Sequence, residues 1–126
     1  MKKQIAILGS TGSIGTQALE VIAEHPDLFE VYCLTANNKV EELARQARQF
    51  RPAAVIIANE EKYDHLKDLL SDMPDIKVYA GSKAIDDIVE AGPIDMVLTA
   101  MVGFAGLNPT IHAIMARKKI CLANKE

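Results

Sequence analysis

Short apolar runs alternate along the chain with longer stretches in which apolar residues recur every three or four positions. The short runs predict six β-strands. Most of them are apolar throughout rather than at every second position, which favours strands covered on both faces, as in a parallel sheet. The predicted strands cover residues 4–8, 31–35, 54–58, 77–79, 96–100 and 119–123.

The longer stretches predict five helices that separate the strands. The first should end before His25-Pro26, because the residue before a proline disfavours the helical conformation. Ser82 is a candidate N-cap, and Asn108-Pro109 is typical of a helix start. The helices are expected over residues 13–24, 40–50 and 60–71, from Ser82 to the Gly92-Pro93 pair, and from Asn108 onward.

Strict alternation of strands and helices is typical of a doubly wound, Rossmann-like α/β fold, with a mostly parallel sheet and helices on both faces. The chain has 126 residues and no internal linker, low-complexity segment or short repeat. A chain of this length can bury a sizeable core as one unit. We therefore expect a single domain over residues 1–126.

Composition narrows the function. The net charge of −3 gives no general reason to expect nucleic-acid binding. No apolar stretch approaches the roughly 20 residues of a membrane span, and the first apolar run is too short for a signal peptide. Cys33 and Cys121 lie in apolar runs, as buried reduced thiols do. We expect a cytoplasmic protein with neither a nucleic-acid nor a membrane partner.

No side-chain cluster in the sequence suggests catalysis or metal binding. His25, His65 and His112 fall on separate predicted elements without ligand spacing, and each is expected at the surface. Acidic pairs occur near the first turns of helices, where they suit the helix dipole without a catalytic role. The sequence therefore predicts no catalytic residue and no metal ligand within these 126 residues.

Three glycines directly follow the first predicted strand. Gly9, Gly12 and Gly15 allow a sharp turn into a helix and leave no Cβ between the backbone and a bound phosphate. The first N–H groups of the helix and the positive end of its dipole would face that anion. This context indicates a dinucleotide site, although a tight turn without a ligand is the alternative.

Hydroxyl groups accompany the glycines on the same loop. Ser10, Thr11 and Ser13 are each expected to add a donor for the phosphates.

The second predicted strand should lead to the residues that contact the adenosine ribose. An NAD site usually places a carboxylate there, whereas this chain has Asn37, Asn38 and Lys39. A neutral-to-basic loop favours the 2′-phosphate of NADP. The alternative is that the two asparagines form a plain turn and that Lys39 is only solvated.

Ligands of open α/β sheets bind at the carboxyl ends of the strands. The fifth predicted strand leads into Ala100 and Met101, followed by a glycine-bearing stretch that could pass close to a cofactor. The sixth leads into Asn124, Lys125 and Glu126. Without further argument, the stretch that begins at Ala100 could be a plain loop, and residues 124–126 could be an ordinary polar terminus.

The chain resembles the 1-deoxy-D-xylulose 5-phosphate reductoisomerase family in four segments that occur in the family's order and at its separations. The glycine loop together with the Ala-Asn-Lys-Glu ending is the most specific part. The segments are Ile7-Leu-Gly-Ser-Thr-Gly-Ser-Ile-Gly15, His25-Pro-Asp-x-Phe29, Ala100-Met-Val-Gly-x-Ala-Gly-Leu107 and Leu122-Ala-Asn-Lys-Glu126.

The resemblance implies the N-terminal NADPH-binding domain of an enzyme in non-mevalonate isoprenoid biosynthesis. Members of that family isomerise and reduce 1-deoxy-D-xylulose 5-phosphate to 2-C-methyl-D-erythritol 4-phosphate, using NADPH and Mg2+ or Mn2+. The full-length parent is expected to be a homodimer. The family's metal ligands and its catalytic and C-terminal domains are expected beyond residue 126, so the fragment alone should bind NADPH without turnover.

By the same resemblance, Thr11, Gly12, Ser13 and Ile14 would contact the cofactor phosphates. Asn124 and Glu126 would contact the cofactor, and Lys125 the sugar-phosphate substrate. Family members often carry Gly-Lys-Asn where this chain has Asn-Asn-Lys, so the basic residue is shifted. The complete predicted cofactor set is Gly9, Thr11, Gly12, Ser13, Ile14, Asn37, Asn38, Lys39, Ala100, Met101, Asn124 and Glu126.

Two other functions fit the residues. One is another NADP-linked dehydrogenase with a similar first loop, such as an aspartate-semialdehyde dehydrogenase-like protein, although the Asn-Lys-Glu ending argues against it. The other is a stand-alone module that senses a dinucleotide without chemistry.

Overall fold

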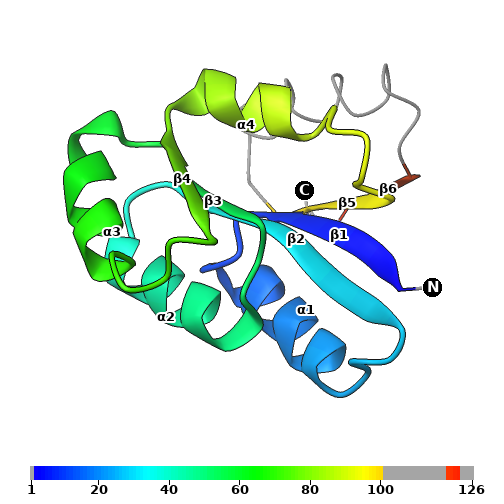
Figure 1. Ribbon diagram of the computed structural model, residues 1–126. Coiled ribbons are helices and arrows are strands. Elements are labelled where there is room, and N and C mark those ends of the chain that lie inside the picture. Colours follow the sequence, from blue (N-terminus) through cyan, green and yellow to red (C-terminus); the bar gives the residue numbers. More distant parts are fainter. Residues whose placement is uncertain (1, 101–118, 123–126) are drawn as a thin grey trace.

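The computed structural model of the chain describes residues 2–100 and 119–122 (Figure 1). Its sheet has six strands in the order β4-β3-β2-β1-β5-β6, and every neighbouring pair is parallel. The strands are β1 (Lys3–Leu8), β2 (Phe29–Ala36), β3 (Ala54–Ile57), β4 (Lys77–Ala80), β5 (Met96–Thr99) and β6 (Lys119–Leu122).

Helices cover both faces of this sheet. Figure 1 shows α1 and α2 on one side of the strands and α4 on the other. The helical segments of the described residues are α1 (Ser13–Ala23), α2 (Val40–Phe50), a short 3-10 turn η1 (Glu60–Lys62), α3 (Tyr63–Leu69) and α4 (Ser82–Ile88). The doubly wound α/β prediction is confirmed.

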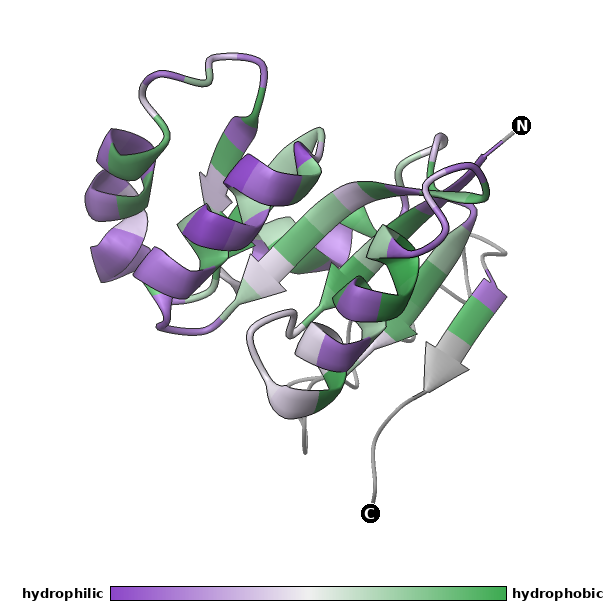
Figure 2. Ribbon diagram, turned by 90° about the horizontal axis from the view of Figure 1, so that it is seen from below, coloured by the Kyte–Doolittle hydropathy of each residue, from purple (hydrophilic) through white to green (hydrophobic). Residues whose placement is uncertain are grey.

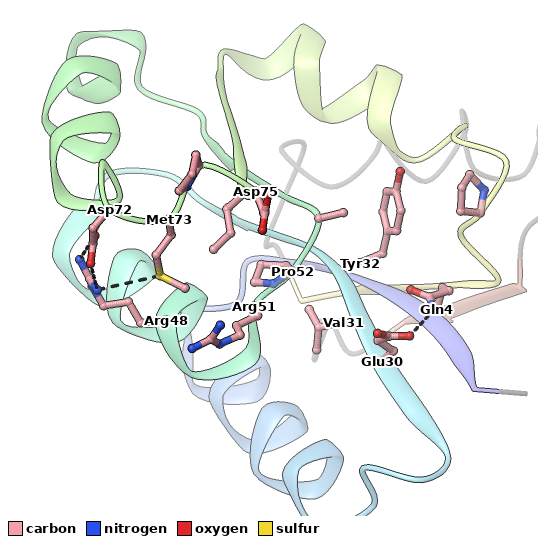
Figure 3. A pocket seen from close by; sticks show the side chains of 14 residues that line it. Gln4, Glu30, Val31, Tyr32, Arg48, Arg51, Pro52, Asp72, Met73 and Asp75 are labelled. Carbon is pink, nitrogen blue, oxygen red and sulfur yellow. Dashed lines mark hydrogen bonds and ion pairs between the residues drawn. The ribbon is translucent and has the colours of Figure 1, made fainter.

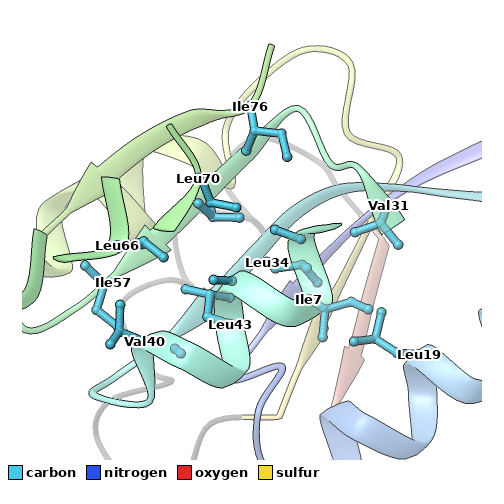
Figure 4. Packing of buried hydrophobic residues seen from close by; sticks show 14 of the residues in the cluster. Ile7, Leu19, Val31, Leu34, Val40, Leu43, Ile57, Leu66, Leu70 and Ile76 are labelled. Atoms are coloured by element: carbon cyan, nitrogen blue, oxygen red, sulfur yellow. The ribbon is translucent and has the colours of Figure 1, made fainter. Parts of the chain in front are cut away.

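Two apolar clusters hold the layers together. On one face, Ile7 and Leu34 of the central strands pack with Leu43 of α2 and Leu66 of α3 (Figure 4). On the other face, Leu8 and the strands beside it pack with Ile85 of α4. Figure 2 shows mostly hydrophobic residues along the central strands and a mixture of hydrophilic and hydrophobic residues along the helices, in line with the continuous apolar runs and the amphipathic stretches of the sequence.

The predicted element bounds agree with the structure to within two residues at most ends, and those of α2 agree at both ends. The third helix differs. Its first turn is the 3-10 segment η1, because the Asn59 side chain accepts a hydrogen bond from Glu61 N and the Asn59 carbonyl accepts one from Lys62 N, three residues on. The predicted fifth helix, from Asn108 onward, lies outside the described residues.

The predicted N-cap of the fourth helix is wrong. Gly81 occupies that position, and Ser82 is the first helical residue. Gly81 has φ +100°, and a Cβ there would lie 2.9 Å from Glu60 Oε2. The chain therefore turns on a glycine, which adopts this conformation without strain.

The predicted surface histidines and buried cysteines can be compared with the structure at three positions. His25 and His65 are exposed, and Cys33 is a buried free thiol whose pKa is raised to about 12 by burial. These three predictions are confirmed, whereas His112 and the Cys121 side chain are not described. Among the described helices, none is both long and apolar enough to span a bilayer.

Strand order places the functional edge of the sheet. From β1 the chain moves outward through β2, β3 and β4, and it then returns to the other side of β1 with β5 and β6. Along the chain, β1 is followed by its neighbour on one side, β2, and β5 by its neighbour on the other, β6. Ligands of open α/β sheets bind at the carboxyl ends of the strands beside such a switch point. The predicted glycine loop follows β1 at this switch point.

Candidate functional site

The site is built where β1 and β5 end side by side. Leu8 is paired with Thr99, and Ala100 N donates a 2.9 Å hydrogen bond to the Leu8 carbonyl. Ala100 therefore lies next to Gly9, as a shared ligand site requires. Thr99 is buried, and its Oγ1 has no hydrogen-bond partner among the described residues.

The three loop glycines have different structural roles. Gly9 has φ +82°, a conformation that favours glycine. Gly15 lies so close to the loop that a Cβ would be 2.4 Å from Gly9 O and 2.7 Å from Ser10 Cα. Gly12 is exposed with φ −77°, and the nearest atom to its Cβ would be Gly9 O at 3.7 Å. The fold thus needs two of the glycines, whereas Gly12 is free to serve a ligand.

Hydrogen bonds within the protein already use some of the loop's N–H groups. Gly9 N donates to Thr35 Oγ1 at 3.0 Å, and Ser10 N donates to the Thr35 carbonyl at 2.8 Å. Gly12 N is 3.3 Å from the Gly9 carbonyl oxygen. The end of β2 therefore holds the first half of the loop in a fixed shape.

The remaining N–H groups of the loop have no acceptor in the described part of the chain. They belong to Thr11 and to the first three residues of α1, which are Ser13, Ile14 and Gly15. Unpaired donors at a helix N-terminus, with the positive end of its dipole, make a site for an anion such as a phosphate. The arrangement fits the predicted pyrophosphate site.

The predicted role of the Ser10 hydroxyl is wrong. Its side chain is fully buried, and its Oγ donates to Gln46 Oε1 at 2.7 Å, with the Thr35 carbonyl oxygen 3.2 Å away. It points into the protein because α2 supplies a buried polar partner. Thr11 is half-buried and Ser13 is exposed, so their predicted roles stay open.

Gln46 is the residue of this region that the sequence interpretation missed. It is buried at 3% exposure on the sheet-facing side of α2, and its Nε2 donates to the Ser10 carbonyl at 2.9 Å. The available signal was weak: Gln46 is a polar residue three positions after Leu43, beside the apolar stripe of an amphipathic helix.

The second predicted subsite lies at the carboxyl end of β2. Asn37, Asn38 and Lys39 are all exposed there. Asn59, which follows β3, donates its side-chain Nδ2 to Asn38 Oδ1 at 2.7 Å and its backbone N to the Asn37 carbonyl at 3.0 Å. The side-chain amides of Asn37 and Asn38 and the Lys39 ammonium are thus the side-chain donors that this loop presents to a ligand.

Several predicted residues lie outside the described part of the chain: Met101, Asn124, Lys125 and Glu126. The structure brings the other predicted cofactor residues to one edge of the sheet, namely Gly9, Thr11, Gly12, Ser13, Ile14, Asn37, Asn38, Lys39 and Ala100. Among the described residues, no three His, Cys, Asp or Glu side chains gather as a metal site would require.

A separate hollow of about 780 Å³ lies at the opposite, amino-terminal edge of the sheet (Figure 3). Arg48 donates to Asp72 at 2.6 Å and to the Leu69 carbonyl at 2.7 Å, and this guanidinium holds the pKa of the exposed Asp72 carboxyl below its usual value. Despite its size, this hollow is not the candidate site, because ligands of open parallel sheets bind at the carboxyl ends of the strands.

Comparison with known proteins gives the same family from sequence and from structure. The family model for 1-deoxy-D-xylulose 5-phosphate reductoisomerase matches residues 5–126. The protein of that name from Bacteroides thetaiotaomicron is 74% identical over 125 residues, covering 99% of this chain. The one from Microcystis aeruginosa is 48% identical over 125 residues. The chain spans about a third of their length, 32% in each case.

Solved structures agree. A 1-deoxy-D-xylulose 5-phosphate reductoisomerase from Zymomonas mobilis in complex with NADPH superposes with a TM-score of 0.93 at 34% identity, covering 98% of this chain and 32% of that one. A DOX-P reductoisomerase in complex with NADPH, fosmidomycin and magnesium superposes with a TM-score of 0.92, also at 34% identity, covering 97% and 30%. The chain belongs to the 1-deoxy-D-xylulose 5-phosphate reductoisomerase family.

Proposed function

We propose that this chain binds NADPH and forms the cofactor-binding part of a 1-deoxy-D-xylulose 5-phosphate reductoisomerase. The glycine loop is the observation that carries the proposal. Thr11, Ser13 and Ile14 present N–H groups without an acceptor among the described residues, and Gly12 is exposed beside them without a need for glycine in the fold. A pyrophosphate supplies the acceptors that these donors lack.

The preference for NADPH over NADH rests on the second loop. Lys39 and the Asn38 amide present donors at the carboxyl end of β2, and the loop of residues 37–39 contains no carboxylate that would accept from a free 2′-hydroxyl. A charge-assisted hydrogen bond to a 2′-phosphate contributes about 1.5–3 kcal/mol. We expect the loop to favour NADPH by roughly tenfold to a hundredfold.

The proposal for the whole protein includes the reaction of the family. Bound NADPH supplies a hydride, and the parts of the chain described above bind and orient the cofactor. We include a divalent metal ion, Mg2+ or Mn2+, held by carboxylates outside the described residues, since those residues gather no ligand set. Four points stay predictions. They are the cofactor contacts of Met101, Asn124 and Glu126, the substrate contact of Lys125, the homodimer and the cytoplasmic location.

Calorimetric titration of the full-length protein with NADPH and with NADH tests cofactor binding. Tighter binding of NADPH is expected. Equal affinity for both would contradict the 2′-phosphate assignment, and binding of neither would contradict the cofactor role itself.

NADPH oxidation by the full-length protein in the presence of 1-deoxy-D-xylulose 5-phosphate and Mg2+ tests the reaction. Turnover is expected, and it should stop when a chelator removes the metal. NADPH binding without turnover would instead indicate a dinucleotide-sensing module.

A further inference from the structure

The glycine loop is held by Gln46, which lies 36 positions after the loop residue Ser10. We propose that Gln46 is a positioning residue that aims the Thr11 N–H at the cofactor pyrophosphate. The inference rests on the proposed NADPH binding, and it assigns a role to a buried side chain of α2 that itself touches no cofactor.

Both ends of the Gln46 carboxamide contact a single residue. Oε1 accepts from the Ser10 hydroxyl at 2.7 Å, and Nε2 donates to the Ser10 carbonyl at 2.9 Å. Gln46 and Ser10 are 3% and 0% exposed, so both hydrogen bonds are shielded from water. A reciprocal pair of buried bonds fixes the orientation of the groups that form it, because breaking either bond leaves an unsatisfied polar group.

The consequence for the loop follows from peptide geometry. In a planar trans peptide the carbonyl oxygen and the next N–H point in opposite directions. Since the Ser10 carbonyl is tied toward α2, the Thr11 N–H of the same peptide must point away from α2. That N–H has no acceptor among the described residues, as a ligand-binding donor requires.

Gln46 and Thr35 therefore have different tasks. Thr35 accepts the N–H groups of Gly9 and Ser10 and so removes them from the set available to a ligand. Gln46 contacts the carbonyl side of the next peptide and leaves its N–H available. Bonds from β2 thus decide which N–H groups of the loop stay unpaired, and bonds from α2 fix the direction of the Thr11 N–H.

The Gln46→Met substitution tests the role, because methionine has a similar length and remains a good helix former. In the full-length protein we expect the NADPH Kd and the KM for NADPH to rise by roughly tenfold to a hundredfold, while kcat changes by less than about threefold. Gln49→Met, an exposed position on the same helix, is the matched control and should leave all three values unchanged.

Adenosine 2′-monophosphate separates positioning from general damage, because it contains the adenosine and 2′-phosphate but no pyrophosphate. Its inhibition constant against NADPH should be the same in the wild type and in Gln46→Met. An unchanged NADPH Kd would overturn the proposal. So would an equal loss for adenosine 2′-monophosphate, which would mean that the whole site is disturbed.

The Gln46→Glu substitution keeps the test decisive if the methionine variant does not fold. A neutral carboxyl reproduces both bonds, since its carbonyl accepts from the Ser10 hydroxyl and its O–H donates to the Ser10 carbonyl. An ionised carboxylate cannot donate, and it repels that carbonyl. The ratio of variant to wild-type Kd, measured with acid-stable NADP+, should therefore approach one at low pH and rise as the introduced carboxyl ionises.

A pH-independent ratio for Gln46→Glu would overturn the inference. The wild type is the reference for the proposed function: if it fails to bind NADPH, the cofactor role is wrong. If the wild type binds and the Gln46 variants bind equally well, only the positioning role is wrong.

Discussion

The two edges of the sheet differ in whether their polar groups are paired within the protein. At the amino-terminal edge, which holds the hollow of about 780 Å³, charged and polar side chains bind one another, as Arg48 does with Asp72 and Gln4 with Glu30. At the carboxyl edge, hydrogen bonds within the protein hold the glycine loop in place, and the N–H groups of Thr11 and Ser13 lack acceptors among the described residues.

We infer from this difference that fixed, unsatisfied donors mark the proposed binding site, rather than the volume of a hollow. Side chains that are already paired must break those pairs before they bind a ligand. Backbone donors held by a separate set of buried bonds need no such change. The following variants test this contrast between the two edges.

The largest effect is expected from Gly15→Ala. The added Cβ would lie 2.4 Å from Gly9 O and 2.7 Å from Ser10 Cα, so backbone must move. We expect the free energy of unfolding to fall by about 1–3 kcal/mol, as overpacked sites do, and NADPH affinity to fall more than about a hundredfold. Denaturant unfolding and calorimetry measure the two effects. Wild-type affinity would mean that the loop shape is not needed.

Gly12→Ala should separate binding from folding. Its Cβ would lie 3.7 Å from Gly9 O, an ordinary contact, but Gly12 is exposed where we propose that the cofactor phosphates bind. NADPH affinity should fall by roughly tenfold to a hundredfold, while the free energy of unfolding changes by less than about 1 kcal/mol. Parallel titration and thermal unfolding check both. If stability fell and binding stayed, Gly12 would serve the fold.

A smaller and cofactor-selective effect is expected from Lys39→Ala. Loss of the exposed cation at the carboxyl edge should lower the affinity for NADPH by about tenfold. The affinity for NADH should stay unchanged, because only NADPH carries the 2′-phosphate. Lys77→Ala, which removes an exposed cation at the start of β4 on the amino-terminal edge, is the matched control and should change neither. Equal losses for the two cofactors in Lys39→Ala would refute the assignment.

The smallest effect is expected from Asp72→Asn at the amino-terminal edge, which should leave NADPH affinity unchanged. Arg48 lowers the pKa of the Asp72 carboxyl, so the pair stabilises the fold above the usual Asp pKa, and this contribution is lost as pH falls through the lowered value. The Tm difference between wild type and variant should be slight at neutral pH, disappear in acid and shrink in salt. A changed cofactor Kd would show that the two edges are coupled.

Local sequence patterns predicted most of the fold. The helix Val40–Phe50 has the expected bounds because its apolar face is regular and Pro52 follows closely. The glycine loop was predicted because the strand before it and the helix after it are both evident in the sequence. Where the pattern did not distinguish an α-helix from a 3-10 turn, at Glu60–Lys62, the prediction was wrong in detail.

The part of the site that could not be predicted depends on tertiary contacts. Ser10 was expected to face a ligand, and instead it contacts Gln46, which is 36 residues away. No spacing rule links a serine in a turn to a glutamine in the next helix. The same limit applies to Asn59, whose bond to Asn38 joins two loops that only the sheet brings together.

The bonds from Thr35 and Gln46 also lead to an expectation for the rate of the proposed cofactor binding. A mobile loop loses about 1–2 kcal/mol of backbone entropy per residue when a ligand orders it, and such ordering slows association. Here Gly9 and Ser10 are already tied to β2 and α2. NADPH should therefore associate without waiting for the loop to order. Substitutions that remove the bonds from Thr35 or Gln46 should then mainly shorten the time for which NADPH stays bound.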